Sequence, residues 1–223
     1  MVRIAHASID ERGKISGGQA GDQTGKEVCI RSWYSKPWNV VIRFKNPAMR
    51  QKVADCMIRA AHNPRIGYDQ INRNSLLKYA RNVGYDPQKV TALCETDCSA
   101  LVTLACIYAG IKEDALVVNG NSATTRTLRK LLEATGMVEV FTGKDYTAKA
   151  DKLLPGDILL AEGHHVAVVV QTDPQPEKTT HDIALEVIDN KWSTGNRRKE
   201  LLKAAGYDPV AVQAEVNRIL RGK

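Results

Sequence analysis

The sequence predicts an α+β fold, in which helices pack on an antiparallel sheet, followed by a small three-helix bundle. One observation is the apolar helical pattern of residues 95–111, ETDCSALVTLACIYAGI, which predicts a buried helix. A second is the segment 156–170, GDILLAEGHHVAVVV, whose two β-prone runs meet at Glu162-Gly163 and predict an antiparallel strand pair. A third is the polar stretch of residues 171–180. The residues after this stretch show helical periodicity and no strand pattern.

This polar stretch, QTDPQPEKTT, divides the chain into two predicted domains. It contains two prolines and no large apolar residue, which is typical of a linker. We therefore expect a larger domain over residues 1–172, a linker over 173–181 and a C-terminal module over 182–223. The larger domain is long enough to bury one sizeable core.

The larger domain begins with a glycine-rich segment, GKISGGQAGDQTGKEV, which is typical of a loop. The β-prone runs at 27–33 and 38–44 then predict two strands joined across residues 34–37. A helix is predicted over 46–63, because Asn46 can cap it and Pro47 suits its first turn.

Two further helices flank the apolar one. Ser75 predicts the cap of a helix that Gly84 ends. The segment 122–136 predicts another helix, which ends at Gly136.

The composition limits the class of protein. No apolar run approaches the ~18 residues of a membrane span, and the polar N-terminus MVRIAHASIDERGK lacks the apolar stretch of a secretion signal. We therefore expect synthesis in the cytoplasm, where the five cysteines do not form a disulfide framework. The net charge of +7 suits an anionic polymer such as nucleic acid, lipid headgroups or cell wall. The chain lacks the zinc-finger spacing and the clustered basic helix that would favour DNA.

Cys98 is the strongest candidate for a reactive side chain. With Asp97 or Thr96 as cap, it lies on the first turn of the apolar helix, among backbone N–H groups that favour a thiolate. The same N–H groups can stabilise an oxyanion. Cys56 and Cys106 lie inside helical patterns and are interpreted as core residues.

A nucleophilic thiol needs a base, which is usually a histidine. His164 and His165 open the second strand of the predicted pair, and strand side chains alternate between faces, so only one of them can point at Cys98.

Two motifs resemble those of the NlpC-type papain-like cell-wall cysteine peptidases. TDCSALV resembles the Asp-Cys-Ser-Gly-Leu-Val signature of that family, with Ala100 in place of glycine. LLPGDILLAEGHHVAVVV resembles its Pro-Gly-Asp hairpin and histidine strand. The resemblance implies a papain-like fold, Cys98 as nucleophile and His165 as base. It also implies substrate-binding roles for Tyr68, in RIGYDQ, and for Ser99.

The family also places a polar residue on the strand after the histidine strand, where it orients the imidazole. Here the predicted linker begins at that point, so this strand is missing. The N-terminal β-prone runs are the alternative source of the sheet. We expect the orienting side chain to come from GDQT, either from Asp22 or from Gln23.

A zinc site is the alternative for these residues. Cys94 and Cys98, with His164 and His165, could nominally provide four ligands. Because adjacent strand histidines diverge and Cys94 precedes the cap, we expect no metal and no cofactor.

The C-terminal module resembles the CW-seven cell-wall-binding repeat of phage lysozymes. The resemblance is carried by Trp192, Gly195, Arg198 and the segment AGYD that ends at Asp208. It implies binding to the peptidoglycan muropeptide, for which we expect Arg198 to be a contact. Trp192 is interpreted as a core residue. A single repeat implies weak binding, or avidity through self-association.

Together these observations predict a phage-type endolysin that hydrolyses an amide bond of a Gram-positive-type wall through Cys98 and His165. The bond is either within the stem peptide (endopeptidase) or between muramic acid and L-alanine (N-acetylmuramoyl-L-alanine amidase). The expected route is synthesis in the host cytoplasm, without a signal peptide, and access to the wall after membrane permeabilisation. The alternatives are a bacterial autolysin, a non-catalytic wall-binding protein and a nucleic-acid-binding protein.

Overall fold

The computed structural model of the chain describes residues 1–172, 179–204 and 207–221. The chain separates into two compact units, residues 1–173 and residues 174–223. Each unit has its own apolar core, so each is described by itself.

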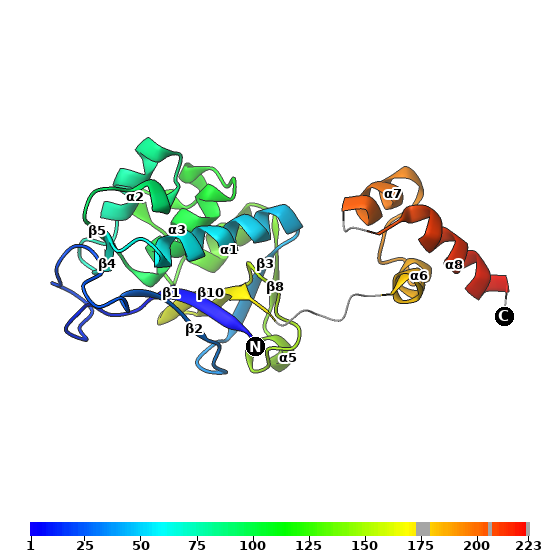
Figure 1. The fold of residues 1–223 in the computed structure, drawn as a ribbon, viewed down its shortest axis with the longest axis horizontal. Coiled ribbons are helices and arrows are strands. Elements are labelled where there is room, and N and C mark those ends of the chain that lie inside the picture. Colours follow the sequence, from blue (N-terminus) through cyan, green and yellow to red (C-terminus); the bar gives the residue numbers. More distant parts are fainter. Residues whose placement is uncertain (173–178, 205–206, 222–223) are drawn as a thin grey trace. The chain divides into compact units, whose positions relative to one another are not determined.

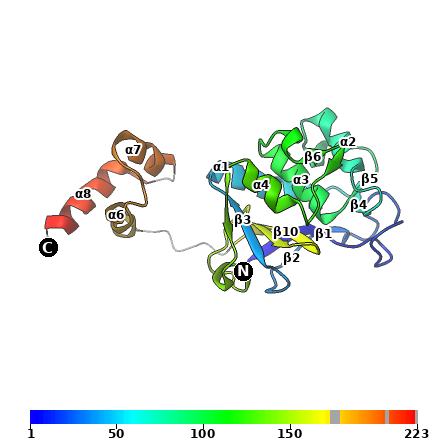
Figure 2. The same cartoon turned by 180° about the vertical axis from the view of Figure 1, so that it is seen from behind.

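The first unit is built on a six-stranded sheet with the strand order β2-β1-β10-β9-β3-β8, and all of its pairings are antiparallel. Figure 1 shows helices α1 and α3 on one side of this sheet, and Figure 2 shows α4 on that same side. The sheet strands are β1 (Arg3–Ala7), β2 (Val28–Ser32), β3 (Val40–Phe44), β8 (Val138–Phe141), β9 (Ile158–Ala161) and β10 (His165–Gln171).

The remaining elements of this unit lie along the connections. A parallel pair joins β4 to β5, and an antiparallel pair joins β6 to β7. The short strands are β4 (Ile66–Tyr68), β5 (Cys94–Thr96), β6 (Val117–Val118) and β7 (Asn121–Ser122). The helices are α1 (Pro47–Ala61), α2 (Ser75–Ala80), α3 (Cys98–Tyr108), α4 (Leu128–Ala134) and α5 (Lys144–Thr147), with 3₁₀ turns at Arg81–Val83, Pro87–Lys89 and Glu113–Ala115.

Local signals explain where α1 and α3 begin. The side chain of Asn46 accepts a hydrogen bond from the Ala48 N–H at 2.8 Å, and Pro47 opens the first turn of α1, as predicted. In α3 every residue from Cys98 to Ile107 is buried. A helix that is apolar on all sides is stable only inside a core, which is where α3 lies, packed against α1 and β10.

Apolar side chains cover both faces of the sheet. The larger cluster joins the sheet to α1 and α3 and includes Phe44, Met57, Leu104 and Val168. A second cluster includes Ile4, Trp38, Leu159 and Val169, and Tyr146 of α5 packs against it. The predicted α+β class, with helices on an antiparallel sheet, is confirmed.

The N-terminal strand β1 was not predicted, because only five residues form it and its flanks are polar. It pairs with β2 on one side and with β10 on the other. The strands predicted at 27–33 and 38–44 exist as β2 and β3, but they are not neighbours, since β1, β10 and β9 lie between them. The sheet next to β10 is therefore completed by the N-terminus of the chain.

Two helix starts differ from the predictions. Ser75 is the first residue of α2 and not its cap, because its hydroxyl exchanges hydrogen bonds with the backbone of Glu95 on β5. Helix α4 begins at Leu128 and not at Ser122, because Ser122 belongs to β7. Both differences come from contacts with distant residues that local helix signals do not encode.

The second unit contains helices α6 (Thr180–Ile188), α7 (Gly195–Ala204) and α8 (Pro209–Arg221). A capping box at Thr179 and Asp182 begins α6. Trp192 lies partly buried against the core of this unit, which among the described residues consists of Ile183, Ala184, Val187, Leu202, Val212 and Val216. None of the helices that the structure describes is long and apolar enough to span a bilayer.

Candidate active site

Cys98 is the first residue of α3 and follows directly on Asp97, the N-cap. The Asp97 backbone is extended, and its carboxylate accepts a hydrogen bond from the Ala100 N–H at 2.7 Å. Strand β5 leads into this cap and is held in register by β4. The thiol is thus at a rigid, capped helix terminus, as predicted, and only 5% of the residue is exposed.

The start of β10 meets the thiol. The backbone N–H of Val166 donates a hydrogen bond to the Cys98 sulfur, and so does the N–H of Ser99. Val166 directly follows His165, so the sulfur lies beside the His165–Val166 peptide. His164 is exposed. The structure therefore brings the two residues that the sequence singled out, Cys98 and His165, to one place.

The imidazole of His165 contacts a second histidine that the sequence analysis did not single out. Nδ1 of His6, on β1, lies 2.8 Å from Nε2 of His165, and the two rings meet edge to face. The contact exists because β1 pairs with β10 across 159 positions of the chain. The available signal was the run RIAHA, in which a histidine follows a short apolar stretch.

Asp22, one of the two predicted orienting residues, has a different role. Its carboxylate accepts hydrogen bonds from backbone N–H groups of its own loop, including those of Thr24 and Gly25 at 3.2 and 2.6 Å. The loop is held against β4, where a Cβ on Gly67 would meet the backbone of Gly21. The expectation for Asp22 is corrected: His6 is the side chain that contacts His165.

An aromatic stack extends from His165 toward the surface. The Trp38 ring lies 5.9 Å from the imidazole, centroid to centroid, and Tyr34 lies 5.2 Å from Trp38. The Trp38 indole N–H donates to the Tyr34 carbonyl at 2.7 Å, which fixes the loop between β2 and β3. The stack covers one face of the imidazole and shields it from water.

Burial sets the protonation of the site. Burial, with a smaller contribution from Asp97, raises the pKa of the Cys98 thiol to about 12, although N–H donors and Arg73 act in the opposite direction. Burial lowers the pKa of His165 to about 4 and that of His6 to about 3. The expectation of a thiolate at rest is therefore corrected, because desolvation outweighs the field of the helix terminus. The site holds a neutral thiol next to neutral imidazoles.

Arg73 fixes the cap of α3. Its guanidinium donates to both carboxylate oxygens of Asp97, at 2.6 and 3.1 Å, and to the Ser99 hydroxyl at 2.8 Å. It also donates to the carbonyls of Ser122 and Ala123, at 2.9 and 2.8 Å. Arg73 was not predicted, because nothing in its local sequence points to a partner 24 residues away.

The two predicted substrate-binding residues are both buried. The Ser99 hydroxyl donates to Asp97 and accepts from Arg73, so the cap uses it fully. The Tyr68 hydroxyl accepts a hydrogen bond from the Gln70 side chain at 3.1 Å, and burial raises its pKa. Cys98 contributes to the raised pKa of Tyr68, which places Tyr68 in the same part of the molecule.

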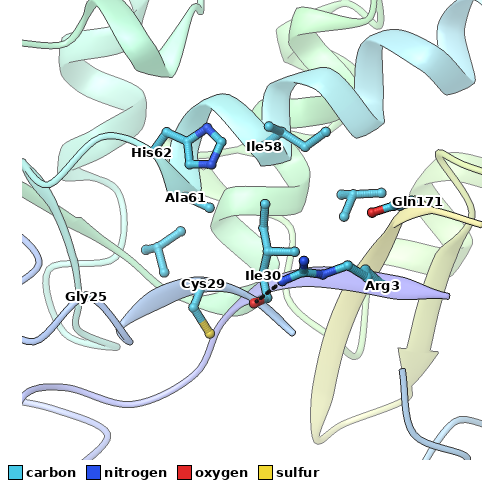
Figure 3. A pocket seen from close by; sticks show the side chains of 10 residues that line it. Arg3, Gly25, Cys29, Ile30, Ile58, Ala61, His62 and Gln171 are labelled. Carbon is cyan, nitrogen blue, oxygen red and sulfur yellow. Dashed lines mark hydrogen bonds between the residues drawn. The ribbon is translucent and has the colours of Figure 1, made fainter. Parts of the chain in front are cut away.

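Cys94 and a separate cavity complete the surroundings. The Cys94 thiol faces the Arg65 carbonyl at 3.6 Å, and the part of the chain that the structure describes holds no group of three or more His, Cys, Asp or Glu arranged for a metal ion. A cavity of about 550 Å³ lies between the end of α1 and strands β1 and β2. Figure 3 shows its lining side chains, among them Arg3, Cys29, Ile58, His62 and Gln171. Neither Cys98 nor His165 lines this cavity.

Arg198, the predicted wall contact, lies on α7 of the second unit. Its Nε donates to the Ser193 carbonyl at 2.9 Å. It borders a small cavity of about 120 Å³ between α7 and α8, together with Lys199, Leu202, Pro209 and Gln213. The side chain is half-buried, and its hydrogen bond to the Ser193 carbonyl orients it.

Comparison with known families places both units. The family model described as an endolysin-like domain matches residues 4–176, and the model of the CW_7 repeat matches residues 181–220. No curated protein and no solved structure matches the chain.

Proposed function

We infer that this chain, which belongs to the endolysin-like domain family, is a peptidoglycan hydrolase that cleaves an amide bond with Cys98 as nucleophile. The endolysin-like domain and the CW_7 repeat together make it a cell-wall-related lytic protein. The observation that carries the proposed chemistry is the hydrogen bond from the Val166 N–H to the Cys98 sulfur, which places the thiol beside His165. An NlpC-type papain-like arrangement accounts for this geometry.

The contact between the histidines defines which nitrogen can act as base. Nε2 of His165 is engaged by His6, so Nδ1 is left for the thiol proton. A basic Nδ1 requires the hydrogen of neutral His165 to be on Nε2, from which it donates to Nδ1 of His6. His6 thus takes the orienting role that the resemblance gives to a third polar residue.

The reaction begins from the neutral pair. The Cys98 proton passes to Nδ1 of His165 as the sulfur attacks the amide carbonyl, because neither group is ionised beforehand. The backbone N–H of Cys98 stabilises the oxyanion, because the N–H groups of Ser99, Ala100 and Leu101 already donate to Cys98 or Asp97. His165 then returns the proton to the departing amine, and the thioester remains. Water, deprotonated by His165, hydrolyses the thioester and restores the thiol.

The second unit supplies attachment to the substrate. A CW_7 repeat implies binding to the cell wall, and Arg198 at the cavity between α7 and α8 is the proposed contact. The proposed substrate is the peptidoglycan of a Gram-positive-type wall, reached from the host cytoplasm after the membrane is permeabilised. Endopeptidase and N-acetylmuramoyl-L-alanine amidase activities both fit this site.

Replacement of the nucleophile tests the proposal. We expect Cys98→Ala to abolish the clearing of purified Gram-positive walls while wall binding in a pelleting assay is retained. Cys29→Ser, at a half-buried thiol, is the control and should keep its activity. Mass spectrometry of the soluble products identifies the cleaved bond. If Cys98→Ala clears walls at the rate of the unmodified protein, the proposal is wrong. If neither the unmodified protein nor any variant clears walls, the protein is a wall-binding protein without hydrolase activity.

A further inference from the structure

We propose that Arg31 binds a free carboxylate of the cell-wall peptide next to the scissile amide. This inference rests on the proposed function and adds the substrate feature that the site selects. It concerns a residue on β2, one of the two edge strands of the six-stranded sheet, which neither the motifs nor the proposed mechanism uses.

The register of the sheet places Arg31 on the face that holds the imidazoles. Cys29 of β2 is paired with His6 of β1, and directly paired residues of an antiparallel sheet point to the same face. Arg31 is two positions after Cys29, so it shares that face. Val28, by contrast, is buried in the cluster that contains α1 and α3.

The guanidinium ends the aromatic stack that begins at His165. Its central carbon lies 5.1 Å from the centroid of the Tyr34 ring, and Tyr34 stacks on Trp38, which stacks on the imidazole. A cation held over an aromatic face keeps its planar edge free for hydrogen bonding. The stack therefore orients Arg31 at the rim of the candidate active site.

The positive charge of Arg31 is available to a ligand. In residues 1–172, 179–204 and 207–221 no carboxylate forms an ion pair with it and no carbonyl accepts from it, and the residue is exposed. Its field nevertheless reaches the site, because it contributes to the lowered pKa of both His6 and His165. Arg73, at the cap of α3, differs because its guanidinium already donates hydrogen bonds to the Asp97 carboxylate and to the Ser122 carbonyl.

The chemistry of the ligand follows from this geometry. Stem peptides of peptidoglycan carry free carboxylates on their D-amino acids, and a guanidinium pairs with a carboxylate through two parallel hydrogen bonds. Amidation of that carboxylate removes the negative charge while its size and shape are nearly unchanged. Discrimination between the free and the amidated peptide is therefore the property that Arg31 should confer.

Binding to the full-length Cys98→Ala protein measures this discrimination without turnover. The probes are a disaccharide-peptide with free carboxylates and the same compound with its carboxylates converted to amides. We expect the free form to bind about 10-fold to 100-fold more tightly, which is the range for a charge-assisted pair. Arg31→Gln in the same background should bring the two affinities within about 2-fold, and Arg31→Lys should lie between.

The control is Arg3→Gln, which removes an equal charge from the neighbouring strand. Arg3 lines the cavity on the side of α1 (Figure 3), so its loss should leave the discrimination unchanged. Equal binding of the two probes, absence of binding, or unchanged discrimination in Arg31→Gln would each overturn the inference. Kinetics with the unmodified protein, which retains Cys98, separate the two proposals. If this protein cleaves both probes with equal kcat/KM, the inference on Arg31 is wrong but the proposed hydrolase function is supported.

Discussion

In residues 1–172 several ion pairs lie inside the protein, whereas the ion pairs of residues 179–204 and 207–221 lie at the surface. The Asp157 side chain is fully buried against Arg43 at 2.6 Å, and Asp97 is nearly buried against Arg73 at the same distance. In the second unit Glu215 pairs with His181 and Arg218, both of which are at least half exposed.

The difference follows from the size of the two cores. Burying a charge is favourable only if several partners replace its hydration, and this requires many ordered segments around it. The cap of α3 gathers donors and acceptors from three such segments, whereas among the described residues of the second unit six buried side chains form the core. A large core can therefore hold a desolvated chemical site, and a small one offers a surface for attachment.

Arg73→Ala should have the largest effect. It leaves Asp97 desolvated without its partner, and we expect the first unit to lose about 3–5 kcal/mol of unfolding free energy. Arg218→Ala removes an exposed partner and should leave the unfolding of the second unit unchanged within error. Denaturant unfolding of the full chain measures both. Equal effects of the two substitutions would contradict the contrast between the units.

Acid should destabilise the first unit more than the second. The folded-state pKa of His165, about 4, lies below its ordinary value of 6.5, so the unfolded chain binds more protons between these values. Stability is full above about pH 6.5 and falls as the pH drops toward 4, by on the order of 3 kcal/mol for His165. His6 adds a loss in the same direction.

The second unit should not respond in this window. Arg218 and His181 lower the pKa of the Glu215 carboxyl to about 2, so its stabilising contribution is lost only as the pH falls from 4.5 toward 2. Unfolding measured from pH 7.5 to 4 tests the contrast, and a double variant, His6→Gln with His165→Gln, should flatten the dependence of the first unit. A dependence that survives in this variant would show that other groups cause it.

Among the substitutions that we expect to lower stability, Thr179→Ala should have the smallest effect. Thr179 and Asp97 both cap a helix, but Thr179 is exposed and its partner is Asp182 of the same turn. Loss of an isolated cap typically costs about 1 kcal/mol. We expect a loss of this size in the unfolding of the second unit and no change in wall clearing. A loss as large as that of Arg73→Ala would indicate that this cap, too, belongs to a wider network.

The elements with local signals were predictable. The Asn46 cap, the Pro47 start of α1 and the turn before β10 each depend on residues within a few positions of one another. The position of Cys98 on the first turn of α3 was predictable for the same reason. Strand β1 and the true start of α4 were not, because distant pairing decides them.

The sequence by itself therefore determined the α+β class, the capped helix that begins at Cys98 and the strand that begins at His165. Only the tertiary structure decided that His6 contacts His165, that Arg73 holds the cap, and that the thiol is neutral. The physical reason is the distance along the chain over which each effect acts. Capping and periodicity act over three or four residues, whereas desolvation and cross-strand contact depend on which distant segments close around a group.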